Sequence, residues 1–137
     1  MISAGFLLKG NLCRVVTLNG SRVQHVRVAD KFHKLELTAN PSQDDVEVFV
    51  QTIKAFCSDN SIDLITINFR NAKGDHAGGA ATFRIEGIIL ASSPVPVKQV
   101  HPATIAATNR KNLGQKTIKP TTADLGRAYD LAFEGLE

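Results

Sequence analysis

Polar side chains that could act on a ligand gather directly after the apolar run 62–69. They are Arg70, Lys73, Asp75 and His76. A run in which apolar and polar residues do not alternate is typical of a buried central strand. Open α/β sheets carry their sites at the carboxyl ends of such strands. The sequence therefore predicts the working surface of the protein at this point, without indicating a reaction.

Carboxylates that could hold a divalent metal are sparse. Mg²⁺ and Mn²⁺ prefer oxygen ligands, yet the chain has no acidic residue before Asp30 and none between Glu86 and Asp124. The remaining candidates for a catalytic acid set are Asp75, Glu86, Asp124 and Asp130. His76 and His101 do not complete a standard zinc spacing with them. We therefore predict no metal and no other cofactor, with Mg²⁺ or Mn²⁺ at a rearranged acid set as the alternative.

Basic residues give the chain a formal net charge of +3 and a pI near 9.0. A cationic surface can bind a phosphate backbone through charge alone, without reading the bases. The candidate partner-binding residues are Lys9, Arg70, Lys73, His76, Arg84, Arg110 and Lys111. The alternative is that these charges are scattered over the surface and merely solvated.

The first part of the chain predicts an antiparallel meander of three strands. The strand patterns cover residues 2–9, 12–18 and 22–37. Asn19-Gly20 favours a tight hairpin turn, because both residues tolerate positive φ. An irregularity is expected near Ala29 in the third strand. These elements would place Lys9 at the end of the first strand.

Two helices are predicted on either side of the central strand. Ser42 fits the N-cap of the first, with Asp44 and Asp45 in the first turn, where the helix dipole favours negative charge. The second helix is expected to begin at Asp75 or His76. Its buried face is expected to contain Phe83, Gly87, Leu90 and Ala91.

The last third of the chain predicts a short strand at residues 97–100 and a helical turn opened by Pro102, since proline suits the first position of a helix. Residues 109–121 are polar and basic, and they are predicted to form a mobile linker. A final amphipathic helix follows from Leu125 to Leu136. We expect residues 1–137 to form one domain.

The composition fits a soluble domain, with 43% hydrophobic and 21% charged residues. No apolar run approaches the roughly 18–20 residues that cross a bilayer, and no secretory signal is evident. Cys13 and Cys57 lie in apolar runs and are predicted to be buried free thiols. These features predict a cytoplasmic protein without a membrane partner.

The order of elements, three antiparallel strands and then αβαβα, resembles the ribonuclease H-like fold, an α/β fold with a mixed five-stranded sheet. Sequence motifs extend the resemblance to a small bacterial family known as domain of unknown function 3010. The matching segments are Gly5-x-x-Leu8-x-Gly10-Asn11, Arg70, and Lys73-Gly74-x-x-Ala77-Gly78-Gly79-Ala80-x-x-Phe83-Arg84-x-Glu86. That family looks like a remote relative of the RuvC-type junction resolvases.

The resemblance also implies where acids would be expected. Nucleases of this fold hold two divalent metals between carboxylates on the first strand, the fourth strand and the last helix. The resemblance places Leu7 and Phe69 at two of these positions, and neither side chain can bind a metal. Only Asp130 lies where an acid of the last helix would fall, and Arg127 replaces its usual companion. These departures favour a protein that binds over one that cleaves.

Three functions remain open from the sequence. The first is a non-catalytic ribonuclease H-like protein that binds nucleic acid or an acidic protein surface through a basic cleft. The second is a metal-dependent phosphodiester hydrolase that uses the rearranged acid set. The third is a structural or regulatory homodimer, joined through the small-residue segment 77–80 or through an edge strand.

Overall fold

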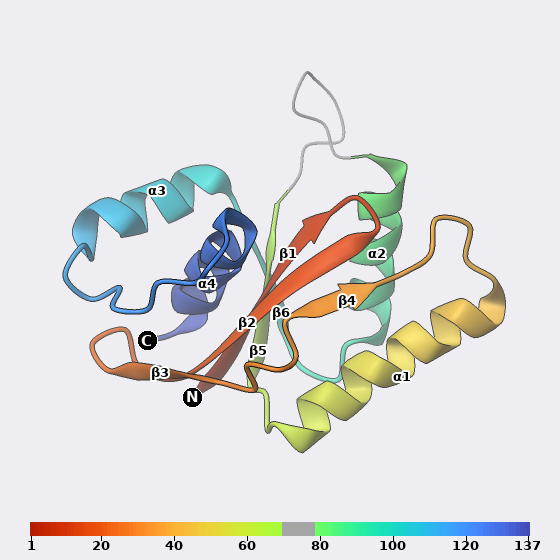
Figure 1. Cartoon of the computed structure of the whole chain (residues 1–137), viewed down its shortest axis with the longest axis horizontal. Helices are drawn as coiled ribbons and strands as arrows, with labels where there is room; N and C mark the ends of the chain where they lie inside the picture. Colours follow the sequence, from red (N-terminus) through yellow and green to blue (C-terminus); the bar gives the residue numbers. More distant parts are fainter. Residues whose placement is uncertain (70–78) are drawn as a thin grey trace.

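β1 (Ile2–Lys9) lies in the middle of a mixed sheet in the computed structural model, which describes residues 1–69 and 79–137 (Figure 1). The other strands are β2 (Leu12–Gly20), β3 (His25–Val28), β4 (Lys34–Glu36), β5 (Leu64–Asn68) and β6 (Val97–Val100). The helices are α1 (Gln43–Asp59), α2 (Ala80–Ser92), α3 (Pro102–Lys111) and α4 (Ala123–Gly135). The predicted α/β order is confirmed.

The sheet has the order β3-β2-β1-β5-β6, and β4 also pairs with β2. β1 is antiparallel to β2 but parallel to β5, and β5 is parallel to β6. As predicted, the first strand is central and adjoins the strand that follows the first helix. The described sheet has six strands rather than five, because the predicted third strand is divided.

The division occurs at Ala29, which has a φ of 50°. An L-residue in this left-handed region cannot continue an extended strand. The carbonyl of Ala29 accepts a hydrogen bond from the Phe32 N–H at 3.0 Å, which closes a turn. β3 and β4 therefore pair with different parts of β2 along the same edge of the sheet.

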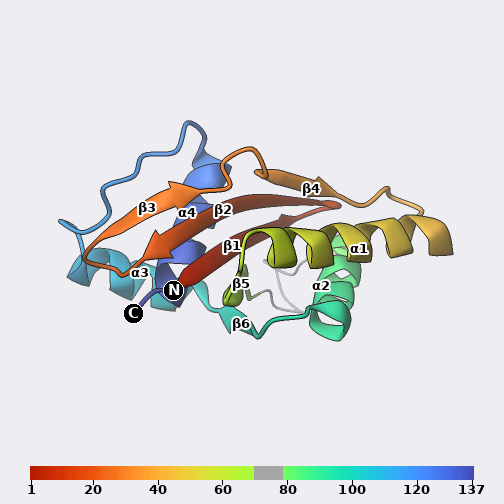
Figure 2. The same ribbon diagram turned by 90° about the horizontal axis from the view of Figure 1, so that it is seen from below.

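Helices cover both faces of the sheet, and β1 contributes side chains to both hydrophobic cores. Phe6 packs in the core that contains Ile53 of α1 and Ile85 of α2. Leu7 faces the other way, into the core that contains Phe133 of α4. Figures 1 and 2 show α1 and α2 at one end of the molecule and α3 and α4 at the other.

α1 begins as the sequence predicts. The Ser42 hydroxyl accepts from the Asp45 N–H at 3.1 Å, and the Asp45 carboxylate accepts from the Ser42 N–H at 2.9 Å. This reciprocal capping box satisfies backbone donors that the first turn leaves open. Phe49, Ile53 and Phe56 then face the sheet.

α2 differs from its prediction in both start and orientation. Gly79 is the N-cap, with extended backbone angles, so the helix begins at Ala80 and not at residue 75 or 76. The buried side chains are those of Thr82, Ile85 and Ile89. The predicted face was wrong. Phe83 is half-buried, and Gly87, Leu90 and Ala91 are exposed.

α3 is longer than the predicted turn, and the linker is correspondingly shorter. Pro102 occupies the start of the helix, as predicted, and the His101 ring accepts from the Ala103 N–H at 3.0 Å. Asn109 to Lys111 complete this helix, so the predicted linker at 109–121 was placed too early. In the two described ranges, no helix combines the length and apolarity needed to cross a membrane.

α4 lies directly on β1 at Gly5. A Cβ atom built on Gly5 would lie 2.5 Å from the Ala132 nitrogen and closer still to the Ala128 carbonyl oxygen. Both of these atoms belong to backbone, which cannot move aside as a flexible side chain can. The absence of a side chain at Gly5 therefore permits the helix-to-sheet distance observed here.

We predict that Gly5→Ala lowers the free energy of unfolding by about 3 kcal/mol or more, because the methyl group would push α4 off the sheet. Gly126→Ala is the matched control. A Cβ there would meet nothing within 4 Å, and alanine favours a helix interior, so stability should rise by about 0.5–1 kcal/mol. Urea unfolding of the two variants measures the difference, and equal stabilities would contradict the assignment.

Cys13 and Cys57 are free and buried, as predicted. Burial raises the pKa of Cys13 from 9.0 to about 12 and that of Cys57 to about 11. We predict slow alkylation of the native protein at pH 8 and rapid alkylation in denaturant, measured by mass spectrometry. Rapid alkylation of the native protein would contradict this burial.

The same burial predicts a pH dependence of stability. Because unfolded thiols lose protons near pH 9 and native ones do not, the free energy of unfolding should fall as pH rises above 9.

Candidate functional site

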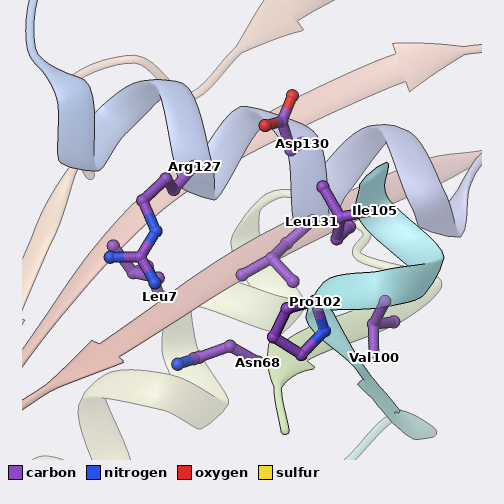
Figure 3. Close-up of a pocket in the computed structure, with 8 residues that line it drawn as sticks. All are labelled: Leu7, Asn68, Val100, Pro102, Ile105, Arg127, Asp130 and Leu131. Atoms are coloured by element: carbon purple, nitrogen blue, oxygen red, sulfur yellow. The ribbon is translucent and has the colours of Figure 1, made fainter. Parts of the chain in front are cut away.

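The carboxyl ends of three parallel strands meet at one edge of the sheet. β1 ends at Lys9, β5 at Asn68 and β6 at Val100. A pocket of about 110 Å³ opens at this edge, between the strands and two helices (Figure 3). Its lining residues are Leu7, Asn68, Val100, Pro102, Ile105, Arg127, Asp130 and Leu131. The pocket lies at the end of the strand where the sequence predicts the working surface, and α3 and α4 contribute the rest of its lining.

Leu7 forms the β1 wall of this pocket. Its side chain is 1% exposed and packs in the core beneath α4. A hydrocarbon side chain offers neither a proton nor a metal ligand. This part of the site can only shape a ligand or exclude water.

Asn68 supplies the β5 wall, and its amide is already used. Its Oδ1 accepts from the Leu8 N–H at 2.8 Å, and its Nδ2 donates to the Leu8 carbonyl at 3.2 Å. The amide therefore joins β5 to β1 by donating one hydrogen bond and accepting another, as a backbone peptide group does. A carboxylate could accept the first bond but could not donate the second. The position requires an amide.

Phe69 lies outside the pocket lining, although the sequence analysis placed it at an acid position. It is 39% exposed, and its ring centroid lies 5.8 Å from that of His101. The site residue contributed by this strand is Asn68 instead. Side chains alternate between the faces of a strand, so moving one residue along β5 changes the face.

Asp130 of α4 has an internal partner. Lys116 Nζ donates to Asp130 Oδ1 at 2.7 Å, and the two side chains are 14% and 24% exposed. Lys116 also donates to Asn109 Oδ1, and its ammonium lies 4.8 Å from the Phe133 ring centroid. Within residues 1–69 and 79–137, the one carboxylate that lines the pocket is thus paired with a cation from the segment between α3 and α4.

Tyr129 is next to this ion pair but is not available for chemistry. Its hydroxyl lies 2.8 Å from His25 Nε2, while His25 Nδ1 lies 3.1 Å from the Ser21 carbonyl. Burial raises the pKa of the Tyr129 phenol. The phenol is therefore a neutral structural group that ties α4 to β3.

Arg127 is the charged group with freedom to bind. It is exposed and extends from α4 toward Leu7 in Figure 3. Within the described part of the chain it makes no hydrogen bond or ion pair. The sequence analysis named Arg127 as a substitution but not as a binding residue. The spacing of Arg127, Asp130 and Leu131 on one helical face is the signal that could have identified it.

The four predicted acids do not form one cluster. Asp124 pairs with Lys9 at 3.5 Å, at the start of α4. Glu86 is on α2, across the sheet from α4, and accepts from Gln99 Nε2 at 3.1 Å. Asp75 lies outside the described residues. Among those the structure describes, no three His, Cys, Asp or Glu side chains gather as a metal site would require.

The predicted basic residues are also dispersed. Lys9 ends β1 and pairs with Asp124, whereas Arg84 is on α2, where its guanidinium donates to the Ala39 carbonyl at 2.9 Å. Arg110 and Lys111 lie in the last turn of α3. Arg70, Lys73 and His76 lie outside the described residues, as do Ala77 and Gly78 of the segment 77–80. The described site is therefore a mainly apolar pocket with Arg127 and Asp130 in its lining.

Comparison with known proteins identifies the architecture. Residues 1–135 match the sequence model of a family described as protein of unknown function (DUF3010). The chain is also similar in structure to RuvC of Thermus thermophilus in complex with a Holliday junction substrate. That likeness has a TM-score of 0.68 at 14% identity and covers 97% of this chain and 90% of the other.

A second structure of Thermus thermophilus RuvC has a TM-score of 0.69 at 13% identity, with 97% and 92% of the two chains covered. The fowlpox virus Holliday junction resolvase has a TM-score of 0.56 at 11% identity, with 98% and 97% covered. No curated protein sequence matches the chain. These likenesses confirm the predicted ribonuclease H-like fold.

We predict that Lys116→Met destabilises the protein by about 1–3 kcal/mol, because it leaves the half-buried Asp130 carboxylate without its charged donor. Asp130→Asn should have a smaller effect, since an amide oxygen still accepts from Lys116. A double-mutant cycle measured by urea unfolding should give a coupling energy of about 0.5 kcal/mol or more. Strict additivity would show that the ion pair has no energetic role.

Proposed function

The chain belongs to the DUF3010 family, and we propose that it is a non-catalytic ribonuclease H-like protein that binds nucleic acid. Binding would take place at the carboxyl edge of β1, β5 and β6, in the cytoplasm. The phosphate backbone would contact Arg127 in the pocket lining and Lys9 at the end of β1. The basic residues of the neighbouring segment 70–78 belong to the same proposal.

The observation that carries the non-catalytic part is the Lys116–Asp130 ion pair. A divalent metal at Asp130 would have to displace an ammonium group that already donates to this carboxylate and to Asn109. Among the described residues, no second carboxylate lines the pocket, where Leu7 and Asn68 occupy the strand positions. A two-metal mechanism needs several oxygen ligands to neutralise the attacking and leaving groups.

Support for a nucleic acid partner comes from charge and from fold. Arg127 is exposed and has no partner within the described ranges, so it is available to a phosphate oxygen. The structure of Thermus thermophilus RuvC is a complex with a Holliday junction substrate. We therefore extend nucleic acid binding, but not cleavage, from that fold to this chain.

We predict that the protein binds fluorescein-labelled DNA in a salt-dependent manner, measured by anisotropy on single strands, duplexes and four-way junctions. Arg127→Gln should weaken binding to all three and lower the slope of log affinity against log salt by about 1. Lys54→Gln on α1 is the matched control, since it removes the same charge from the opposite layer. It should leave the slope nearly unchanged.

Two outcomes would overturn this proposal. Absence of binding at low salt would contradict the proposed binding surface, as would equal effects of Arg127→Gln and Lys54→Gln. Cleavage of any of the three DNAs with Mg²⁺ or Mn²⁺, if abolished by Asp130→Ala, would instead establish the hydrolase with a rearranged acid set.

A further inference from the structure

β4 leaves one side of its backbone without a partner. Val15 N–H donates to the His33 carbonyl at 3.0 Å, and Leu37 N–H donates to the Asn11 carbonyl at 3.0 Å. Between these bonds, Leu35 pairs with Cys13. Because antiparallel strands alternate the direction of their polar groups, the N–H and C=O groups of the two intervening residues point away from β2.

These two residues are Lys34 and Glu36, and their backbone groups have no acceptor or donor elsewhere in the described chain. Figure 2 shows β4 at the margin of the sheet, beside α1. An open edge of this kind is a template for pairing with another strand.

A groove lies between this edge and α1. It has a volume of about 360 Å³. Its lining residues are Leu35, Glu36, Leu37, Thr38, Asp45, Val48, Phe49 and Thr52. Val48 is 66% exposed, although the residue beside it, Phe49, is almost fully buried. An exposed valine in a groove beside an open strand edge favours a protein interface here.

The charges on β4 indicate the partner. Lys34 and Glu36 are 48% and 53% exposed and flank Leu35. If a second copy of β4 paired antiparallel about a two-fold axis through Leu35, Lys34 of each copy would stand opposite Glu36 of the other. Opposite charges on directly facing residues stabilise a strand pair. The sequence of this edge is thus complementary to itself.

The hydrogen-bonding register supports the same axis. The backbone groups of Lys34 and Glu36 point outward, so a Lys34–Glu36 cross-strand pair would exchange both N–H···O bonds. The axis generates that pair twice, which satisfies all the open groups of both residues. Leu35 would meet its symmetry mate in the closer, non-hydrogen-bonded arrangement, and the two grooves would face each other. An isologous interface requires this self-complementarity.

We propose that the β4 edge and Val48 form a dimerisation surface for a second copy of this chain, giving a sheet that continues across the two-fold axis. This inference is independent of the proposed nucleic acid binding, since the pocket lies at the carboxyl ends of β1, β5 and β6. A heterologous peptide in the groove is the competing occupant, and the experiment separates the two.

Sedimentation velocity of the full chain over a concentration series tests the dimer. The wild-type protein should dimerise, and Glu36→Lys should weaken the dimer by about tenfold or more, because lysines would then face lysines. The double variant Lys34→Glu/Glu36→Lys restores opposite charges across the axis and should dimerise like the wild type. Val48→Glu should give a monomer, whereas Val23→Glu, a control at a valine that is 76% exposed, should not.

A monomeric wild type at every concentration would overturn the proposal, as would a dimer indifferent to Glu36→Lys and Val48→Glu. Failure of the charge swap to restore the dimer would overturn the axis through Leu35. Hydrogen exchange gives an independent readout. The amides of Lys34 and Glu36 should gain protection as the concentration rises, while unchanged protection would contradict their pairing.

Discussion

The close contact of α4 with β1 at Gly5 is the constraint on which this structure depends. β1 is the central strand and contributes side chains to both hydrophobic cores, and α4 covers one face of it. At one end Asp124 pairs with Lys9, and at the other Gly135 lies against Ser3 and Thr66. Between these two contacts, the backbone of α4 lies directly against the backbone of β1 at Gly5, which leaves little freedom in the position of the helix. The same contact fixes one side of the pocket, because Arg127, Asp130 and Leu131 lie on α4.

The chemistry of the pocket depends on the side chains that α4 and the strand ends place in it. The fold is ribonuclease H-like, and the side chains that the described strand ends present to the pocket are not carboxylates. Leu7 is part of the core, Asn68 joins two strands, and Asp130 is held by Lys116. Each of these side chains now stabilises the fold. Arg127 remains exposed, so the most accessible charge at the pocket mouth is positive.

Much of the architecture could be predicted from the sequence because local signals and hydrophobic periodicity agreed. The capping box at Ser42 and the proline at the start of α3 produced the expected helix starts. The predicted face of α4 was also right, since Leu125, Ala128, Tyr129, Ala132, Phe133 and Leu136 are all buried. α2 failed this test. Its apolar residues are spread around the helix, so periodicity could not decide whether Ile85 or Leu90 faces the sheet.

The candidate site was predictable in place but not in composition. The carboxyl end of the central strand was identified from an apolar run followed by polar residues. Phe69 and Asn68 are adjacent, however, and only the register of β5 against β1 decides which one enters the pocket. Four of the predicted site residues, Arg70, Lys73, Asp75 and His76, lie outside the described residues, and their roles stay predictions.

The sequence by itself determined the order of the elements, the fold class and the scarcity of carboxylates at the strand ends. These properties depend on local composition and periodicity, which can be read directly from the sequence. Only the tertiary structure decided that Lys116 meets Asp130, that the Asn68 amide bridges to Leu8, and that Arg127 stays exposed at a pocket. Such contacts join residues that are distant in the chain or depend on strand register. The contacts of Asp130 and Arg127 depend on where α4 lies on β1, and Gly5 permits that close approach, whereas the Asn68 bridge depends on the pairing of β5 with β1.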